Sequence, residues 1–375
     1  MSVFSVRLAA AEAPDAPALD LDGRILDFRE LARRVEGEAR RLAPRLAGHE
    51  GAWITPRPTR SSLIRLLALI ELGLPARLLH PRLPPAERDA LIARLPRFVD
   101  LDAPAQRDLP LPHPAALPAP PPDDGRPLVI VSTSGSSGPP RGVVLSRMGL
   151  RRAVEASARR LGWRRNDRWL LALPLAHVGG LSVLLRCLAA RRCVVVPPDT
   201  TPATLGRLLA GGRVSLASLV PTQLRRILDA EPALEARAPL RAILLGGAPA
   251  DPALLARAAA RRLPVLVTYG LSEAGSQVTT QLPGTPPDPA QGAGPPLPGY
   301  QVRISPEGRI QVRSPSLLSA YRPPDPTAPL PDAEGWLTTS DLGWIDEEGR
   351  LHPTGRADAL ILTGGENVSP EQVEG

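Results

Sequence analysis

The chain has 375 residues, of which 43% are hydrophobic, so it is long enough for one large domain or two smaller ones, each with a buried core. It contains no lysine, since all 45 basic residues are arginine, and its net charge is +7. The arginines are scattered along the chain and aromatic residues make up only 3% of it, which argues against a nucleic-acid-binding protein.

The cysteines and the apolar stretches indicate a protein of the cytoplasm. Cys187 and Cys193 lie in apolar segments without metal-ligand spacing, which favours a reducing compartment. The first 15 residues lack the pattern of a signal peptide. The most apolar stretch, residues 169–185, is interrupted by Pro174 and His177, so it predicts a strand, a turn and a helix rather than membrane insertion.

The first part of the chain predicts a hairpin and two helices. A hairpin or a single short strand lies around Asp22 and Gly23, one helix begins near Asp27, and a second covers residues 62–72. Prolines crowd residues 102–127, which predicts an irregular surface connection.

From residue 128 to residue 273, short apolar runs alternate with helical patterns. This alternation is typical of mostly parallel sheets covered by helices, an α/β fold. Strands are predicted at 128–132, 142–145, 169–173, 193–196, 216–220, 242–245 and 265–269, and helices at 146–161, 201–210, 222–229 and 251–261. Beyond about residue 292, short strands and turns predict a small β subdomain over residues 292–355, with strands at 301–304, 309–312 and 344–346.

Polar residues directly follow five of these predicted strands. In open α/β sheets, ligands bind outside the carboxyl ends of the strands, so we expect the five clusters to converge on one crevice. The clusters are residues 133–138, 174–177, 221–223, 246–249 and 270–273.

The first cluster has the chemistry of a phosphate-binding loop. Glycines let backbone N–H groups approach an anion, hydroxyl groups add donors, and Arg141 supplies a permanent positive charge. The spacing of a Walker A loop is missing, and the alternative interpretation is a flexible linker. The residues of this loop are Thr133, Ser134, Gly135, Ser136, Ser137 and Gly138.

Five motifs in order resemble those of the adenylate-forming superfamily, which includes acyl-CoA synthetases, luciferases and peptide-synthetase adenylation domains. They are the loop at 133–142, Gly-Gly-Ala-Pro at 246–249, Tyr-Gly-Leu-Ser-Glu at 269–273, Thr-Ser-Asp-Leu-Gly at 339–343, and Gly-Arg-Ala-Asp at 355–358 followed by Gly-Gly-Glu-Asn-Val at 364–368. The resemblance spans nearly the whole chain. It implies attack of a carboxylate on the α-phosphate of ATP, followed by transfer of the acyl group to the thiol of coenzyme A.

The resemblance also implies a role for each motif. Arg141, in place of the usual lysine, would hold the phosphates with the loop, and Glu273 would ligate Mg²⁺. Tyr269 would pack against adenine, and Asp341 and Arg356 would reach the ribose hydroxyl groups. The other positions implied to contact the nucleotide are Gly246, Gly247, Ala248, Gly270 and Ser272.

Within the superfamily, the segments 173–186, 218–224 and 276–278 are most similar to those of the o-succinylbenzoate:CoA ligases of menaquinone synthesis. His177 stands where the family has a residue that gates the carboxylate, and Arg186 stands where an arginine pairs with the second carboxylate of the acid. Ser218, Thr222 and Gln277 would line the same pocket. The open alternatives are another aryl or medium-chain acid, or an inert nucleotide-binding protein.

The resemblance divides the chain into an AMP-binding domain, residues 1–356, and the start of a mobile domain, residues 357–375, with the hinge at Asp358. Family members carry a catalytic lysine in that mobile domain, whereas this sequence ends at Gly375 without any lysine. We therefore expect slow adenylation and poor thioester transfer from the polypeptide as it stands. The sequence leaves a homodimer open.

Overall fold

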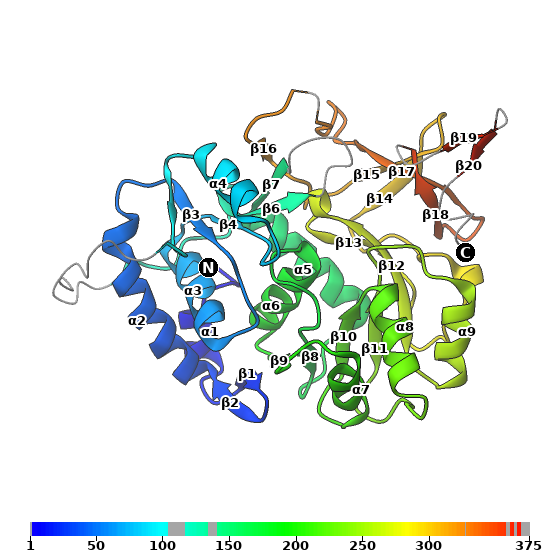
Figure 1. Cartoon of the computed structure of the whole chain (residues 1–375), viewed down its shortest axis with the longest axis horizontal. Helices are drawn as coiled ribbons and strands as arrows, with labels where there is room; N and C mark the ends of the chain where they lie inside the picture. The colour runs from blue at the N-terminus through cyan, green and yellow to red at the C-terminus, as the bar shows by residue number, and fades with distance from the viewer. Residues whose placement is uncertain are drawn as a thin grey trace.

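Three larger β-sheets, one two-stranded ribbon and the helices packed around them make up the described part of the chain (Figure 1). The computed structural model describes residues 2–103, 117–133, 141–326, 328–357, 361–363 and 366–368. The described helices are α1 (Val6–Glu12), α2 (Phe28–Leu46), α3 (Arg60–Leu72), α4 (Pro85–Ala93), α5 (Arg147–Leu161), α6 (Val178–Ala190), α7 (Pro202–Ala210), α8 (Pro221–Ala230) and α9 (Pro252–Ala260).

The largest sheet has eight strands and a parallel centre, with antiparallel pairing at both edges. Its order is β13 (Ser276–Thr280), β12 (Val265–Leu271), β11 (Ala242–Leu245), β10 (Leu216–Leu219), β8 (Arg168–Leu170), β9 (Cys193–Val196), β1 (Pro17–Leu21) and β2 (Arg24–Asp27). The predicted α/β class is confirmed, and the predicted hairpin at Asp22 and Gly23 is the turn between β1 and β2.

The second sheet has six strands and includes the hairpin that carries the predicted phosphate loop. Its order is β16 (Ala320–Arg322), β7 (Arg141–Ser146), β6 (Pro127–Thr133), β4 (Ala76–Leu78), β3 (Gly51–Ile54) and β5 (Phe98–Asp100). The sequence pattern placed 128–132 in one continuous series with the later strands. In the structure β6 instead pairs with β4, from the N-terminal part of the chain.

The third sheet has four antiparallel strands: β14 (Gln301–Ile304), β15 (Arg309–Arg313), β17 (Leu337–Ile345) and β18 (Leu351–Arg356). A two-stranded ribbon, β19 (Ile361–Thr363) with β20 (Glu366–Val368), follows. The strand predicted at 344–346 is therefore the end of a much longer strand, because the polar residues at the start of β17 hide its alternation. Single 3₁₀ turns lie at Ser272–Ala274 and Pro289–Gln291.

Helix starts follow from capping side chains. Thr59 accepts a hydrogen bond from the backbone N–H of Ser62 at the start of α3, and Ser146 accepts one from Gly149 at the start of α5. Prolines begin α7, α8 and α9, where a missing N–H costs nothing.

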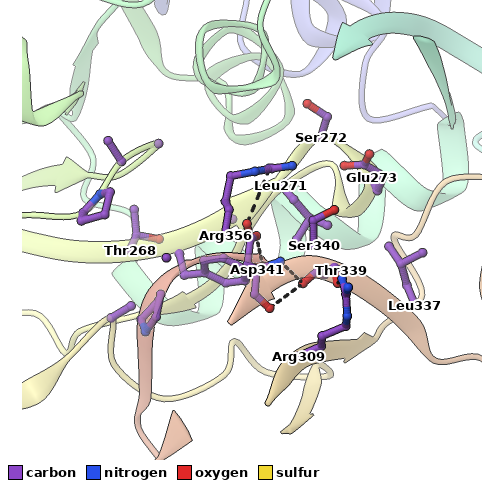
Figure 2. Close-up of a pocket in the computed structure, with 18 of the residues that line it drawn as sticks. Thr268, Leu271, Ser272, Glu273, Arg309, Leu337, Thr339, Ser340, Asp341 and Arg356 are labelled. Carbon is purple, nitrogen blue, oxygen red and sulfur yellow. Dashed lines mark hydrogen bonds and ion pairs between the residues drawn. The ribbon is translucent and has the colours of Figure 1, made fainter. Parts of the chain in front are cut away.

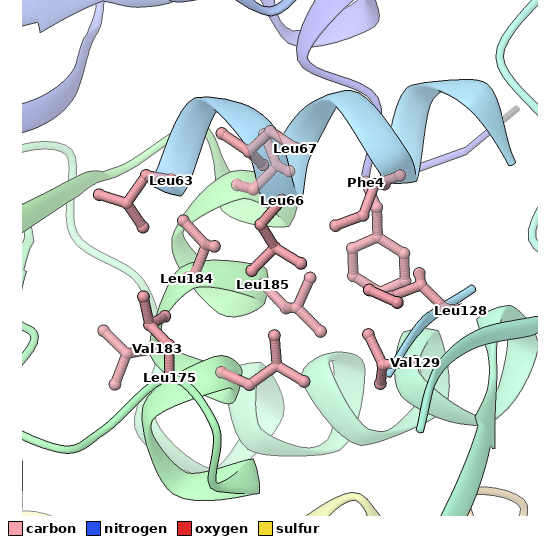
Figure 3. Close-up of a cluster of buried hydrophobic side chains, with 14 of the residues drawn as sticks. Phe4, Leu63, Leu66, Leu67, Leu128, Val129, Leu175, Val183, Leu184 and Leu185 are labelled. Carbon is pink, nitrogen blue, oxygen red and sulfur yellow. The ribbon is translucent and has the colours of Figure 1, made fainter. Parts of the chain in front are cut away.

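Helices α3 and α6 pack against each other in the main core (Figure 3). Leu66 of α3 points toward Leu184 and Leu185 of α6, and all three are essentially inaccessible. Strand β6 contributes Leu128 and Val129 to the same cluster. Burial of such side chains contributes about 1.5–3 kcal/mol each, so this layer holds the two large sheets in a fixed relation.

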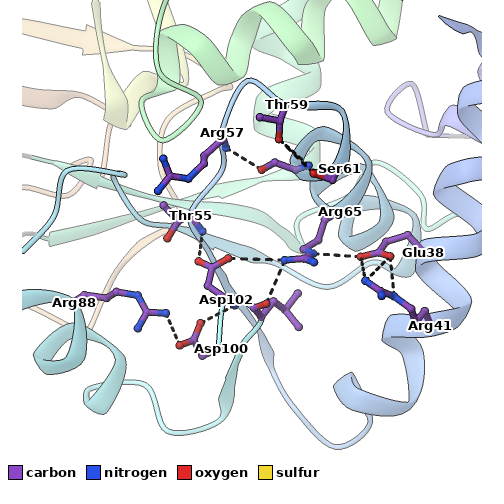
Figure 4. Close-up of polar contacts among 12 residues, drawn as sticks. Glu38, Arg41, Thr55, Arg57, Thr59, Ser61, Arg65, Arg88, Asp100 and Asp102 are labelled. Carbon is purple, nitrogen blue, oxygen red and sulfur yellow. Dashed lines mark hydrogen bonds and ion pairs between the residues drawn. The ribbon is translucent and has the colours of Figure 1, made fainter. Parts of the chain in front are cut away.

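Ion pairs and hydrogen bonds reinforce the outer side of the second sheet (Figure 4). Arg65 of α3 contacts Glu38 of α2 at 3.2 Å, and Asp102 accepts a hydrogen bond from the backbone N–H of Thr55 at 2.7 Å. In the largest sheet, the buried carboxylate of Asp20 on β1 pairs with Arg168 and, at 2.6 Å, with Arg213. These contacts tie neighbouring strands and helices together away from the cavity.

Candidate active site

A cavity of about 1020 Å³ lies where the three sheets meet. Every sheet contributes to its walls: Ser132 and Arg141 come from the second, Tyr269 from the largest, and Asp341 and Arg356 from the third. Figure 2 shows Asp341, Thr339 and Arg356 on one wall, with Ser272 and Glu273 close by. Of the site residues predicted from the sequence, the lining includes Arg141, His177, Gly247, Ala248, Tyr269, Gly270, Ser272, Glu273, Asp341 and Arg356.

Glycine is required at two positions where backbones approach closely. A Cβ atom on Gly270 would lie 2.1 Å from the carbonyl oxygen of Ser276, and one on Gly246 would lie 2.7 Å from that of Thr268. Gly246 itself lies outside the lining, but it positions Gly247, whose φ of 85° favours glycine. The wall beside Ala248 is therefore formed by backbone that a flat ligand can approach.

Tyr269 and Asp341 join two of the sheets at this cavity. The Tyr269 hydroxyl donates a hydrogen bond to Oδ2 of Asp341 over 2.7 Å, and Arg356 Nη1 lies 3.6 Å from Oδ1. Burial, followed by the charge of Asp341, raises the pKa of Tyr269 well above its usual value, so this hydroxyl stays a donor. The carboxylate keeps lone pairs that vicinal hydroxyl groups of a ligand could reach.

Glu273 is a largely buried carboxyl group in the 3₁₀ turn after β12. It accepts a hydrogen bond from the Tyr321 hydroxyl over 3.2 Å. Burial raises its pKa, and the nearby charge of Asp341 acts in the same direction. Among the described residues, no three acidic, histidine or cysteine side chains form a ready metal site. Mg²⁺ fits Glu273 nonetheless, because this ion commonly takes one or two carboxylates and completes its shell with phosphate and water.

Arg141 begins β7 at the mouth of the predicted phosphate loop. Its Nε lies 2.6 Å from Oδ2 of Asp325, which also lines the cavity. Thr133 pairs with Arg141 across the hairpin, so the two ends of the loop are adjacent. The loop residues Ser134, Gly135, Ser136, Ser137 and Gly138 lie outside the described residues, as does Asp358 of the predicted hinge.

Arg186 is a buried cation on α6 behind the cavity. Its side chain is only 3% exposed, and Nη2 donates to the Ser276 hydroxyl over 3.3 Å. The guanidinium carbon lies 5.3 Å from the centroid of the Trp169 ring, a cation–π contact. Burial lowers the pKa of Arg186 to about 10. Among the described residues no carboxylate pairs with it, and its Nε has no hydrogen-bond partner.

The other predicted acid-binding residues lie outside the cavity lining. Ser218 is buried and accepts a hydrogen bond from Trp169 Nε1 over 3.1 Å, so it shares a neighbour with Arg186. Gln277 is buried and accepts a hydrogen bond from Ser157 over 2.8 Å. Thr222 is exposed in the first turn of α8, where the described structure does not direct it to the cavity.

Sequence reasoning missed two residues of this region. Arg309, on β15, lines the cavity and donates to the backbone oxygen of Thr339 over 3.4 Å. His80 follows β4, and its ring centroid lies 5.1 Å from that of His177. His80 follows a strand as the predicted clusters do, but Arg77 interrupts the apolar run that would have revealed β4.

Among the described helices, none is long and apolar enough to cross a membrane.

Comparison with known proteins identifies a family that matches more than half of the chain. The family described as AMP-binding enzyme matches residues 94–322. The 2-succinylbenzoate–CoA ligase of Bacillus licheniformis is 34% identical over 256 residues, which cover 65% of this chain and 53% of that protein. The chain thus spans about half the length of the curated relatives it matches.

The chain is also similar in structure to solved synthetases that act on the same acid as these relatives. The o-succinylbenzoate CoA synthetase of Bacillus subtilis, in complex with its acyl-adenylate intermediate, superposes with a TM-score of 0.86 at 27% identity, covering 100% of this chain and 82% of that one. A structure of the Bacillus subtilis synthetase with ATP and magnesium ion gives a TM-score of 0.84 at 26% identity, covering 100% and 83%.

Proposed function

This chain belongs to the family of AMP-binding enzymes, and we propose that it activates o-succinylbenzoate with ATP for transfer to coenzyme A. In the first step a carboxylate oxygen forms a bond to the α-phosphorus while the bond to the β-phosphate breaks, releasing pyrophosphate. In the second step the thiol of coenzyme A loses its proton and attacks the acyl carbon, and AMP leaves. Two anions must meet in the first step, so charge neutralisation and alignment dominate the barrier.

The convergence of the nucleotide motifs on one cavity supports the first half of this proposal. Gly247, Ala248 and Tyr269 form the wall proposed for adenine, while Asp341 and Arg356 form the wall proposed for ribose. Arg141 lies across the same cavity, where its charge would neutralise the phosphates. Glu273 would hold Mg²⁺, which when bound neutralises phosphate charge as a Lewis acid.

Arg186 is the observation that carries the choice of acid. A guanidinium buried in this way without a carboxylate partner is costly, unless a ligand supplies the negative charge. It contacts Ser276, which pairs with the cavity residue Leu271, so it lies directly behind the site. Ser276 has a φ of 124°, a strained conformation of the kind that concentrates at ligand sites. An aromatic acid with a second carboxylate fits this cation.

A pair of acids isolates the contribution of that second carboxylate. o-Succinylbenzoate and 4-oxo-4-phenylbutanoate differ only in the aromatic carboxylate, so we expect ATP-dependent pyrophosphate exchange and calorimetric binding to favour the first by about ten- to a hundredfold. Equal use of both acids would contradict o-succinylbenzoate as the substrate, and exchange with neither acid would contradict adenylation.

The buried, unpaired Cys187 and Cys193 fit a cytoplasmic location for this activity.

A further inference from the structure

Two histidines from different sheets meet at the edge of the site. His177 is the N-cap residue of α6, which follows β8 of the largest sheet. His80 lies two residues beyond β4 of the second sheet. Their ring centroids are 5.1 Å apart and their planes are tilted by 41°. His177 lines the cavity, whereas His80 is absent from the lining.

A backbone hydrogen bond selects the tautomer of His80. The N–H of Arg82 donates to Nδ1 of His80 over 3.1 Å. Because this donor occupies the Nδ1 lone pair, neutral His80 carries its proton on Nε2. Protonation of Nδ1 would abolish this hydrogen bond. Burial and the charge of Arg82 also lower the pKa of His80, in agreement with a neutral ring.

His177 has an environment that also disfavours a positive charge. It stands at the amino end of the 13-residue helix α6, where the helix dipole is positive. Its ring is open to the cavity, but that concave site removes part of its hydration, which lowers the pKa of His177. A proton on His80 would lower this pKa further, because the two rings would then repel each other as cations. The charged groups that line the same cavity are Arg141, Glu273, Arg309, Asp325, Asp341 and Arg356.

We propose that His80 is a positioning residue, which holds His177 in one orientation and as a neutral imidazole facing the bound acid. A neutral ring can donate one hydrogen bond to the substrate carboxylate and leave its nucleophilic charge intact. An imidazolium would form an ion pair with the same carboxylate and weaken its attack on phosphorus. The effect on catalysis rests on the adenylation proposed above, whereas the coupling of the two rings does not.

The coupling can be measured without any enzymatic activity. The sequence has five histidines, so long-range ¹⁵N–¹H NMR of the ¹⁵N-labelled chain can follow each ring, with His177→Asn assigning that signal. In His80→Gln we expect the pKa of His177 to rise and its tautomer to become mixed. His80→Phe keeps a ring beside His177 but no nitrogen, and we expect the same rise. An unchanged titration and tautomer of His177 in both variants would overturn the proposal.

Pyrophosphate exchange gives the second readout. In His80→Gln we expect the acid limb of the pH profile to move to higher pH and kcat to fall by about tenfold, with the KM for ATP unchanged. With His177→Asn as background, His80→Gln should have no further effect, because His80 acts through that ring. Additive losses in the double variant would contradict the proposal.

Control experiments distinguish the predicted effect of His80 from loss of the fold and from failure of the proposed function. His49 is exposed, so His49→Gln should change neither readout. Thermal unfolding of each variant identifies loss of the fold. If wild-type protein shows no pyrophosphate exchange while His177 still responds to His80, the proposed function fails and the ring coupling stands. If exchange is normal and His177 does not respond, only the role of His80 fails.

Discussion

The hydroxyl of Tyr269 donates a hydrogen bond to the carboxylate of Asp341 across the boundary between two sheets. Tyr269 belongs to β12 of the largest sheet and Asp341 to β17 of the third. The contact orients the carboxylate toward the cavity, and Arg356 approaches its other oxygen. This geometry would orient Asp341 to accept hydrogen bonds from the ribose that we propose for this wall.

Substitution of Asp341 should weaken nucleotides selectively. We expect Asp341→Ala to lower the affinity for both ATP and AMP by about ten- to a hundredfold, because each would lose charge-assisted hydrogen bonds. Tyr269→Phe removes only the orienting hydroxyl and should have a smaller effect. Calorimetry with both nucleotides checks this prediction. A loss confined to ATP would place Asp341 at the phosphates rather than at the ribose.

Arg186 should discriminate between acids rather than between nucleotides. In Arg186→Ala, use of o-succinylbenzoate should fall by about ten- to a hundredfold, to the level of 4-oxo-4-phenylbutanoate, while ATP affinity stays unchanged. Arg186→Lys tests whether charge alone suffices, since lysine lacks the planar fork. An equal loss of ATP binding would show that Arg186 supports the fold of the site instead.

Binding of Mg·ATP should depend on the protonation of Glu273. Burial raises the pKa of Glu273, so on acidification this carboxyl group takes up its proton at a higher pH than an exposed glutamate does. Only the carboxylate ligates Mg²⁺, so affinity should fall as the pH is lowered through that raised pKa. Glu273→Gln should bind Mg·ATP weakly and without this pH dependence, as calorimetry from pH 5 to about pH 8 would show.

The same substitution should stabilise the protein without ligand. A group with a raised pKa in the folded state favours folding below its unfolded pKa, and this contribution is lost as the pH rises through the folded pKa. Glu273→Gln should therefore raise Tm at neutral pH and leave it nearly unchanged in acid. A lower Tm at neutral pH would contradict the predicted cost of the buried carboxylate.

Asp20 should matter for stability and not for binding. Its buried carboxylate lies between Arg168 and Arg213, so Asp20→Asn leaves two guanidinium groups without their partner. Both arginines are partly exposed, so we expect a loss of about 1–3 kcal/mol of unfolding free energy, which is less than for a fully buried pair. Asp15, in the exposed pair with Arg29, provides the matched control, and Asp15→Asn should change little. Urea unfolding measures both, and nucleotide affinity should be retained.

The sequence predicted the strands of the largest sheet well because they are short, apolar and buried. The predicted strands at 193–196 and 242–245 coincide with β9 and β11. The second sheet was harder, since β3, β4 and β5 are short and pair with β6 from a distant part of the chain. Nothing local in those segments specifies such a partner. The residue types from Tyr269 to Glu273 indicated that this segment would line a ligand site. They did not indicate that three sheets would enclose that site.

The acid-binding half of the site shows the other limit of sequence reasoning. The resemblance alone points to Arg186. The contact of its guanidinium with the Trp169 ring, and the hydrogen bond from Trp169 to Ser218, join residues that are distant in the sequence, so only the fold reveals them. His80 was missed because only the meeting of two sheets brings it beside His177. The positions of Ser218, Thr222 and Gln277 outside the cavity lining show that proximity in a motif does not fix which side chain faces the ligand.

The placement of the cavity at the junction of three sheets has a mechanical consequence. A nucleotide held by Ala248 on one side and Arg356 on the other would act as a cross-link between the layer of the largest sheet and the four-stranded sheet. Because the two sheets also share a buried apolar cluster, we expect the nucleotide to strengthen an existing contact between them. Amide exchange in β17 and β18 would then slow on nucleotide addition, while exchange in the leucine layer between α3 and α6 would stay as it was.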